Sequence, residues 1–344
     1  MATVPQWKRE ALISVGDVGE FGLIARISAA LSKGLAGRPD DHVVLGIGDD
    51  AAVLRAPDAR TVATMDLLVE GRHFRRDWSG PYDVGRKAAA QNAADVAAMG
   101  AVPTALLVGF AAPAALELRW AEEFAAGLAA ECARAGAAPV GGDVSAAGTI
   151  MIAITALGDL RGRAPVTRSG ARPGDVVAIA GTLGRSAAGL ALLRAGLGGT
   201  AGAEPLIAAH RRPWPPYEAG PEAARLGATA MIDVSDGLLA DLGHVAAASR
   251  VTIRVHRAAL ECGPDLTAAA DFLLTAGAAH PDPVRWVLTG GEDHALAATF
   301  PAGTVLPARW SVIGSVADPG GAGHGEVLVD GEPYDTGRGW DHFR

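Results

Sequence analysis

Cysteine and long apolar runs are scarce in this chain of 344 residues, and each scarcity excludes a class of protein. The only cysteines, Cys132 and Cys262, provide neither a disulfide framework nor a Cys-x-x-Cys metal site. No charge-free run of about 18 apolar residues exists, and the first residues lack the apolar core of a signal peptide. We therefore expect no membrane span and a cytoplasmic location.

Lysine is scarce as well, and its only positions are Lys8, Lys33 and Lys87. None of them follows a loop of the form Gly-x-x-x-x-Gly-Lys-Ser/Thr, so the chain is not a P-loop enzyme, and the protein-kinase motifs are also missing. A net charge of −8 argues against general binding to nucleic acid or to acidic membranes. Phosphate ligands stay compatible with this charge, because bound metal ions would reverse its sign locally.

Hydrophobic residues make up 49% of the chain, which is enough for the cores of two domains. Predicted strands alternate with helices, and this indicates an α/β fold with mixed sheets. A stretch rich in Arg, Gly and Pro at 159–173 predicts an N-terminal domain at residues 1–160 and a C-terminal domain at residues 161–344. The expected strands are 43–47, 61–65, 105–110, 150–157, 175–180, 228–232, 251–255, 284–288 and 295–300, and the expected helices are 19–31, 84–99, 118–134, 185–195 and 238–248.

Aspartates end several of the predicted strands, usually with a glycine beside them. They are Asp49, Asp50, Asp66, Asp143, Asp233 and Asp236. Taken one at a time, each is typical of an ordinary turn or strand end. Gathered in one cleft, they would repel one another strongly unless divalent cations neutralised them, so the set predicts a site for Mg²⁺ and a polyphosphate. Asp95 shares a helix face with Lys87, Gln91 and Asn92, and it is either a further metal ligand or part of a solvated face.

Other motifs contain the residue types that bind phosphate. Gly141 and Gly142 let a phosphate approach backbone N–H groups, and the guanidinium of Arg168 suits phosphoryl oxygens. The turn at 181–186 offers N–H groups at a helix start as a candidate anion site, and the cationic form of His73 can contact a substrate anion. Each motif also has an ordinary structural explanation, either a turn or a solvated side chain.

In this order along the chain, the motifs resemble those of the thiamine-monophosphate kinase family, within the superfamily that includes aminoimidazole ribonucleotide synthetase. The most specific segment is 66–74, which reads Asp-Leu-Leu-Val-Glu-Gly-Arg-His-Phe. The resemblance implies a two-domain fold in which the N-terminal sheets of two subunits form a dimer barrel and the C-terminal domain completes the active-site cleft. It also implies ATP-dependent phosphorylation of thiamine monophosphate to thiamine diphosphate, by direct in-line transfer with several Mg²⁺ ions.

The resemblance also implies roles for individual residues. Those that look like metal ligands, directly or through water, are Asp50, Thr64, Asp66, Asp95, Asp143, Asp233 and Asp236. Those that look like ATP contacts are Gly142, Asp143, Arg168 and Ser235. Those that look like contacts to thiamine monophosphate are His73, Glu292 and Trp340, with Trp340 beside the aromatic portion. Those expected to act most directly in catalysis are Asp66, Asp95, Asp143 and Arg168.

The chain departs from the family pattern at a few positions. Met65 stands where Ser or Thr often precedes the aspartate, so we expect its backbone carbonyl to replace a hydroxyl ligand. Ala94 precedes Asp95 where Ser is frequent, and His294 follows Asp293 where Tyr is common. Two alternatives stay open: a non-catalytic protein that binds Mg-ATP or thiamine phosphates, and another ATP-using enzyme of the same superfamily.

Overall fold

The computed structural model describes residues 13–35, 42–47, 51–278, 281–319 and 325–334. The chain forms two compact units, which we describe separately. Unit 1 comprises residues 1–93 and 103–159, and unit 2 comprises residues 94–102 and 160–344. The helix α3 (Pro81–Ala98) therefore contributes its last residues to unit 2. No helix among the described residues is long and apolar enough to cross a membrane.

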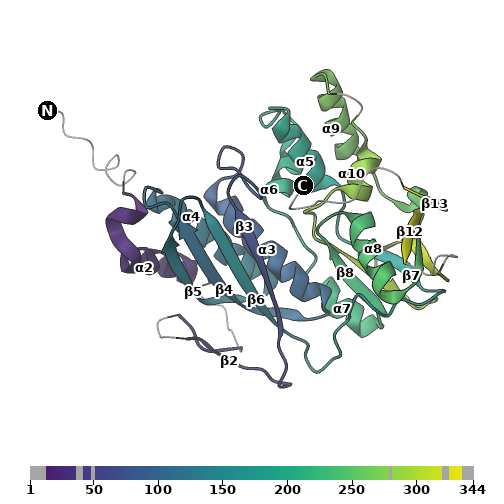
Figure 1. The fold of residues 1–344 in the computed structure, drawn as a ribbon, viewed down its shortest axis with the longest axis horizontal. Helices are drawn as coiled ribbons and strands as arrows, with labels where there is room; N and C mark the ends of the chain where they lie inside the picture. Colours follow the sequence, from purple (N-terminus) through teal and green to yellow (C-terminus); the bar gives the residue numbers. More distant parts are fainter. Residues whose placement is uncertain (1–12, 36–41, 48–50, 279–280, 320–324, 335–344) are drawn as a thin grey trace. The chain divides into compact units, whose positions relative to one another are not determined.

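Unit 1 contains a four-stranded sheet in the order β3-β6-β4-β5, with α3 and α4 on one face (Figure 1). Its strands are β3 (Val62–Val69), β6 (Met151–Asp159), β4 (Val102–Ala112) and β5 (Ala138–Ala146). The strands β3 and β6 are antiparallel, whereas β4 and β5 are parallel. The helix α2 (Val15–Leu35) packs against α4 (Leu118–Ala135), and a short hairpin consists of β1 (Val43–Leu45) and β2 (Val53–Leu54).

Aromatic side chains form the centre of the unit 1 core between α4 and the sheet. The ring centroids of Phe110 and Phe124 are 5.4 Å apart, and those of Trp120 and Phe124 are 5.8 Å apart. Burial of such rings is a large stabilising term, because each removes about 150–250 Å² of surface from water. Gly136 ends α4 in a left-handed conformation, and its N–H donates to the carbonyl of Cys132.

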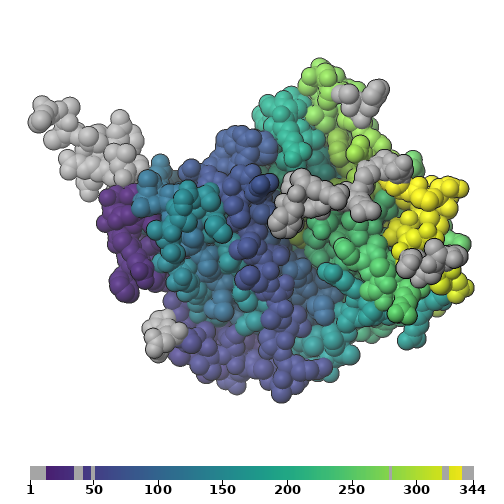
Figure 2. All heavy atoms as spheres, in the orientation of Figure 1, coloured from purple at the N-terminus to yellow at the C-terminus, as the bar shows by residue number. Residues whose placement is uncertain are grey.

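Unit 2 contains a seven-stranded sheet in the order β13-β12-β9-β11-β7-β10-β8. Its strands are β7 (Val176–Ala180), β8 (Ala230–Val234), β9 (Thr252–Val255), β10 (Ala295–Phe300), β11 (Trp310–Ala317), β12 (Glu326–Val329) and β13 (Glu332–Pro333). All neighbours are antiparallel except β12 and β9. The strand β13 at one edge of the sheet and its neighbour β12 are seen at the surface, in yellow in Figure 2.

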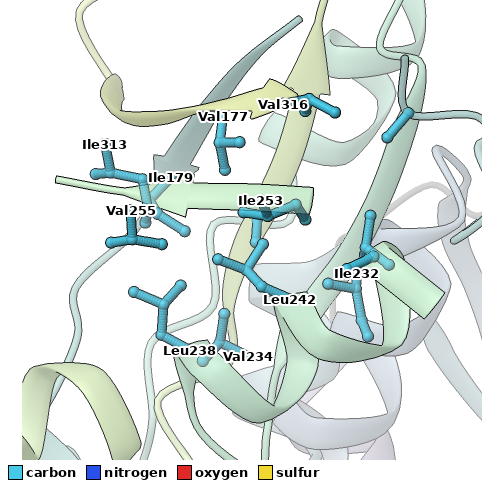
Figure 3. Close-up of a cluster of buried hydrophobic side chains, with 14 of the residues drawn as sticks. Val177, Ile179, Ile232, Val234, Leu238, Leu242, Ile253, Val255, Ile313 and Val316 are labelled. Atoms are coloured by element: carbon cyan, nitrogen blue, oxygen red, sulfur yellow. The ribbon is translucent and has the colours of Figure 1, made fainter. Parts of the chain in front are cut away.

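Helices complete unit 2. They are α5 (Arg185–Arg194), α6 (Glu204–Arg211), α7 (Ala219–Leu226), α8 (Leu238–Ser249), α9 (Pro264–Thr275) and α10 (Pro283–Thr289), with a 3₁₀ turn η1 at Arg257–Ala259. Figure 3 shows the main core, where Leu238 and Leu242 of α8 point toward Ile232, Val234 and Ile253 of the sheet. Each of these buried aliphatic side chains stabilises the fold by about 1.5–3 kcal/mol. This core fixes the start of α8, which directly follows the Asp233–Asp236 motif.

The fold class is confirmed, but several local predictions are wrong. The segment 284–288 was expected as a strand and is the helix α10, because the Asp282 side chain caps it by accepting from the N–H of Val284 and Pro283 occupies the first turn. Asp66 and Asp143 were expected at strand ends, but they lie inside β3 and β5. In both strands the chain continues past the acid because pairing with a neighbouring strand continues.

Candidate functional site

The predicted site residues divide between the two units. Asp50 and Trp340 lie outside the described residues, as does Asp49. Unit 1 contains Thr64, Met65, Asp66, His73, Gly142 and Asp143. Unit 2 contains Asp95, Arg168, Asp233, Ser235, Asp236 and Glu292.

In unit 1, Asp66 is half-buried on β3 and is held by two residues of α3. Its backbone N–H donates to Oδ1 of Asn92 at 2.9 Å, and Nε2 of Gln91 lies 3.3 Å from its carboxylate oxygen Oδ2. Asn92 is fully buried and donates its own amide to the carbonyl of Ala88, so both ends of this amide are satisfied. The predicted polar face of α3 is therefore in contact with β3 rather than solvated.

Met65 lies next to Asp66 in sequence but on the opposite side of β3. Successive side chains in a strand alternate between faces, and Met65 is 57% exposed whereas Thr64 and Asp66 are half-buried. A side chain at position 65 therefore does not lie beside the carboxylate of Asp66. The thioether of Met65 is excluded as a neighbour of this acid, and the expected role of its backbone carbonyl stays a prediction.

Gly142 and Asp143 lie on β5, where both are exposed. They pair with Val108 and Gly109 of β4. A Cβ atom at Gly142 would overlap the carbonyl oxygen of Val108, so the strand pairing itself requires glycine here. The absence of a side chain, which suggested room for a phosphate, is therefore explained by backbone packing.

In unit 2, two motifs that are distant in sequence lie side by side. The N–H of Glu292 donates to the carbonyl of Ser235 at 2.8 Å, and the N–H of His294 donates to that of Val234 at 2.9 Å. A Cβ atom at Gly291 would lie 2.5 Å from the carbonyl oxygen of Ser235, so glycine is needed for this close approach. Glu292 and His294 themselves have φ angles of 64° and 54°, a strained conformation that is concentrated at functional sites.

The carboxylates of this region lie near one buried imidazole, that of His294, and raise its pKa. The Nδ1 atom of His294 lies 3.1 Å from Oδ2 of Asp233, and both side chains are buried. Burial opposes protonation, but the hydrogen bond and charge of Asp233, together with the charges of Asp95 and Glu292, raise the pKa of His294. Three acids that were predicted separately thus lie near one another in unit 2.

A further acid, Asp241 of α8, supports the same loop. Its carboxylate accepts from the N–H of Asp236 at 3.0 Å and from the N–H of Gly237 at 3.1 Å. Burial, reinforced by the charge of Asp233, raises the pKa of Asp241 to about 7. The two N–H donors fix the loop that presents Asp236.

The turn at 181–186 was predicted as a candidate anion site, and the structure fills it with a side chain of the protein. The carboxylate of Asp293 accepts from the N–H of Gly184 at 2.6 Å and from the N–H of Ser186 at 2.9 Å. These are the N–H groups that a phosphate would need at the start of α5. Asp293 therefore caps this helix, and the turn does not offer these two groups to a ligand.

Glu292 has a buried polar neighbour in His210 of α6. The Nδ1 atom of His210 lies 3.4 Å from the carboxylate of Glu292 and 3.1 Å from Oγ of Ser186. Both His210 and Ser186 are buried, whereas Glu292 is half-exposed. The imidazole thus contacts Glu292 from the protein side and restricts the positions of its carboxylate.

Arg168 is exposed on a loop whose backbone is hydrogen-bonded to the hydroxyl of Ser249. The Oγ of Ser249, the last residue of α8, accepts from the N–H groups of Gly170 and Ala171 at 3.0 and 3.1 Å. The same hydroxyl donates to the carbonyl of Arg168 at 3.0 Å. All three bonds hold the loop backbone, so Ser249 limits where the guanidinium of Arg168 can reach.

The donor set fits Mg²⁺ chemically, although the described residues do not form a complete cation site. Among the residues that the structure describes, no three His, Cys, Asp or Glu side chains are arranged to hold a metal ion. Carboxylate oxygens are nevertheless the ligands that Mg²⁺ prefers. Burial is the main cause of the raised pKa of Asp241 and the charge of Asp233 adds to it, so a nearby cation would favour the charged form of Asp241.

Sequence reasoning missed the supporting contacts of four residues, which are Lys87, whose Nζ donates to the carbonyl of His73, and His210, Asp241 and Ser249. None follows a glycine or ends a strand, so the pattern used to find the acids does not select them. Only Asp241 had a local signal, because an acid in the first turn of a helix is typical of N-terminal capping. The other three act on segments far away in sequence.

Comparisons with known proteins show the family to which the chain belongs. Residues 48–160 match the N-terminal domain, and residues 172–277 the C-terminal domain, of the AIR synthase related proteins. Thiamine-monophosphate kinase of Mycobacterium tuberculosis (strain CDC 1551 / Oshkosh) is 51% identical over 328 residues, which are 95% of this chain and 92% of the relative. The protein of the same name from Escherichia coli (strain K12) is 37% identical over 342 residues, covering 94% and 98% of the two chains.

Solved structures give the same result. The crystal structure of thiamine-monophosphate kinase from Stenotrophomonas maltophilia K279a has a TM-score of 0.76 and 33% identity, and covers 91% of this chain and 96% of its own. A structure of AaThiL complexed with AMPPCP and TMP has a TM-score of 0.75 and 33% identity, and covers 96% and 99% of the two chains.

Proposed function

The chain belongs to the thiamine-monophosphate kinase family, and we infer that it transfers the γ-phosphoryl group of ATP to thiamine monophosphate, giving ADP and thiamine diphosphate. The observation that carries this conclusion is similarity over nearly the whole length of relatives with that activity in their names. One similar structure is complexed with AMPPCP, an analogue of ATP, and with TMP, the expected acceptor.

Direct in-line transfer is the mechanism that these residues support best. The attacking phosphate oxygen of thiamine monophosphate is already an anion, so no strong general base is needed. The main barrier is repulsion between two anionic phosphate chains, which positioning and charge compensation must offset. Arg168, on the loop that Ser249 holds, supplies a guanidinium for phosphoryl oxygens, and Ser235 lies beside Glu292.

We further propose that the reaction requires bound Mg²⁺ ions. The residues that would hold it are Asp50, Thr64, Asp66, Asp95, Asp143, Asp233 and Asp236, with the backbone carbonyl of Met65. When bound, the ions would neutralise negative charge on both phosphate chains. Glu292 and His73, and Trp340 beside the aromatic rings, are proposed to contact thiamine monophosphate. We also place the reaction in the cytoplasm.

A coupled ADP-release assay with several acceptors tests the proposed function. Thiamine monophosphate should support Mg²⁺-dependent ADP formation, whereas thiamine and aminoimidazole precursors should give much lower rates. ADP formation only with an aminoimidazole precursor would favour another enzyme of the superfamily. Saturable binding of ATP and thiamine monophosphate without any ADP would favour a non-catalytic binding protein.

We further propose that the protein is a homodimer formed through the open face of the unit 1 sheet. The side chains on that face are exposed and apolar, and they are Met65, Leu67, Leu107 and Met151. An apolar patch of this kind is typical of an interaction site. Leu107→Arg should therefore give monomers in sedimentation velocity, whereas Val312→Arg, at an exposed apolar position of unit 2, should not change the sedimentation coefficient. Sedimentation of the unaltered protein as a monomer at micromolar concentration would contradict this proposal.

A further inference from the structure

The turn that carries His73 is held in one conformation by its own backbone and by the core. The N–H of Gly71 donates to the carbonyl of Phe74 at 2.8 Å, and Gly71 has a φ of 83°. Phe74 is buried and stacks on Trp120, with ring centroids 6.5 Å apart. His73 therefore projects from an anchored turn whose position relative to β3 is fixed.

A second contact fixes the imidazole ring itself. The backbone N–H of Val69 donates to Nδ1 of His73 at 3.0 Å. A backbone N–H can only donate, so Nδ1 must accept and carries no hydrogen. In a neutral imidazole the hydrogen is then on Nε2. An imidazolium would direct an Nδ1–H against the N–H of Val69, so this contact opposes the cationic form expected from the sequence.

The buried positive charge beside this turn is that of Lys87. Lys87 is only 2% exposed on α3, and its Nζ donates to the carbonyl of His73 at 3.2 Å. A buried ammonium must be compensated by hydrogen bonds, so this contact ties α3 to the turn. A nearby cation also disfavours a second charge on the ring. The other charged groups of this turn and of the residues after it are exposed Arg72, the pair Glu70 and Arg76 at 2.6 Å, and the pair Arg75 and Asp77 at 2.6 Å.

We propose that His73 binds the phosphate of thiamine monophosphate as a neutral Nε2–H donor, and that Lys87 is the positioning residue that holds His73 in place. This rests on the proposed function, because it assumes that His73 contacts that substrate. The pairing gives the site a single directed hydrogen bond from the imidazole and leaves the charge on the lysine. It also explains why one of the three lysines of the chain is buried.

The tautomer can be read directly, without any activity measurement. The protein is labelled with ¹⁵N-histidine, and long-range ¹H–¹⁵N spectra are recorded at neutral pH, with the His73→Gln variant to assign the resonances of this ring. We expect Nδ1 of His73 to resonate as a pyridine-type nitrogen and Nε2 as a pyrrole-type nitrogen. Two protonated nitrogens, or the reverse tautomer, would overturn the proposal.

Two isosteric substitutions test the same point kinetically. The amide of glutamine reaches the position of Nε2, whereas that of asparagine reaches only the position of Nδ1. His73→Gln should keep KM for thiamine monophosphate within about threefold, and His73→Asn should raise it by about tenfold or more, with KM for ATP unchanged in both. Equal effects of the two substitutions would contradict an Nε2 donor.

Lys87→Met tests the positioning role, with Lys33→Met as the matched control at an exposed position of α2. We expect Lys87→Met to raise KM for thiamine monophosphate by about tenfold and to leave KM for ATP unchanged. The proposal is overturned if Lys87→Met changes both KM values equally. If this variant does not fold, the spectra of the unaltered protein still decide the tautomer.

These outcomes are distinct from failure of the proposed function. An unaltered protein that forms no ADP with thiamine monophosphate would refute the kinase activity, whatever the tautomer of His73. An active enzyme with a cationic His73 would refute only the inference made here.

Discussion

The candidate acids of the two units differ in how the protein surrounds them. In unit 1, Asp143 is exposed and Asp66 is half-buried, and Nε2 of Gln91 lies 3.3 Å from Oδ2 of Asp66. In unit 2, Asp233 is 4% exposed and Asp241 is 2% exposed, and backbone N–H donors or an imidazole hold their oxygens. The second pair is therefore more deeply buried than the first.

Because of this difference in burial, we expect the acids of the two units to differ in how much they affect stability as well as turnover. A buried carboxylate costs free energy unless it accepts hydrogen bonds, so removing one in unit 2 leaves donors without acceptors. The exposed carboxylate of Asp143 in unit 1 can be hydrated, so its removal leaves no buried donor without an acceptor. We therefore expect substitutions in unit 1 to reduce turnover alone, and substitutions in unit 2 to change the free energy of unfolding as well.

The largest effect is expected for Asp66→Asn. Loss of one charge where two phosphate chains must be compensated should reduce kcat by about 10²–10³-fold and raise the Mg²⁺ concentration needed for half-maximal rate. The melting temperature should not change, and Asp77→Asn, at an exposed acid of unit 1 that pairs with Arg75, should leave both kcat and melting temperature unchanged. Near-normal kcat in Asp66→Asn would remove this residue from the site.

Asp241→Ala in unit 2 should lower the free energy of unfolding, in contrast to substitutions of the acids in unit 1. The N–H groups of Asp236 and Gly237 would lose their acceptor, and the free energy of unfolding should fall by about 1–3 kcal/mol in urea titrations. Asp143→Ala in unit 1 is the comparison, and it should leave the urea midpoint unchanged. Equal losses of unfolding free energy in both variants would contradict the proposed difference between the two units.

The pH dependence of stability gives a further contrast. Burial, opposed by the N–H groups of Ser186 and Gly184, raises the pKa of Asp293 to about 7 from 3.8. An acid with a raised folded-state pKa stabilises the fold below its unfolded pKa, and this contribution is lost as pH rises from about 4 to about 7. The slope of unfolding free energy against pH is set by the difference in bound protons between the folded and unfolded states. Asp293→Asn should therefore reduce this difference by about one proton in that pH window. An unchanged slope would show that Asp293 titrates normally.

The smallest effect is expected for Ser249→Ala. The loop that bears Arg168 would lose three hydrogen bonds to one hydroxyl, and KM for ATP should rise by about three- to tenfold with KM for thiamine monophosphate unchanged. Thr275→Ala, which removes a hydroxyl from the last turn of α9, is the control and should change neither constant. A larger increase in KM for thiamine monophosphate than in KM for ATP would contradict the proposal that this loop binds the nucleotide.

The sequence predicted the family and the fold class, because the motifs and their order are local features of the chain. The family prediction is confirmed by the comparisons, and most predicted helices and strands exist near their expected positions. The segment 284–288 was misassigned because its apolar residues outweighed the capping signal of Asp282 and Pro283.

The site could be predicted only as a set of residues. Gly142 is required by the carbonyl of Val108 on a neighbouring strand, and Asp293 occupies the N–H groups at the start of α5. Both facts depend on contacts between distant segments, which periodicity and turn chemistry cannot reveal. For the same reason, the contact of Lys87 with His73 was not predicted.

The fate of the γ-phosphoryl group tests the central claim most directly. The protein is incubated with Mg²⁺, thiamine monophosphate and ATP labelled with ³²P at the γ position, and products and protein are separated after a single turnover. Label should appear in thiamine diphosphate in a one-to-one ratio with ADP, and the protein should stay unlabelled. Label in the protein or only in inorganic phosphate would contradict direct transfer between the two substrates.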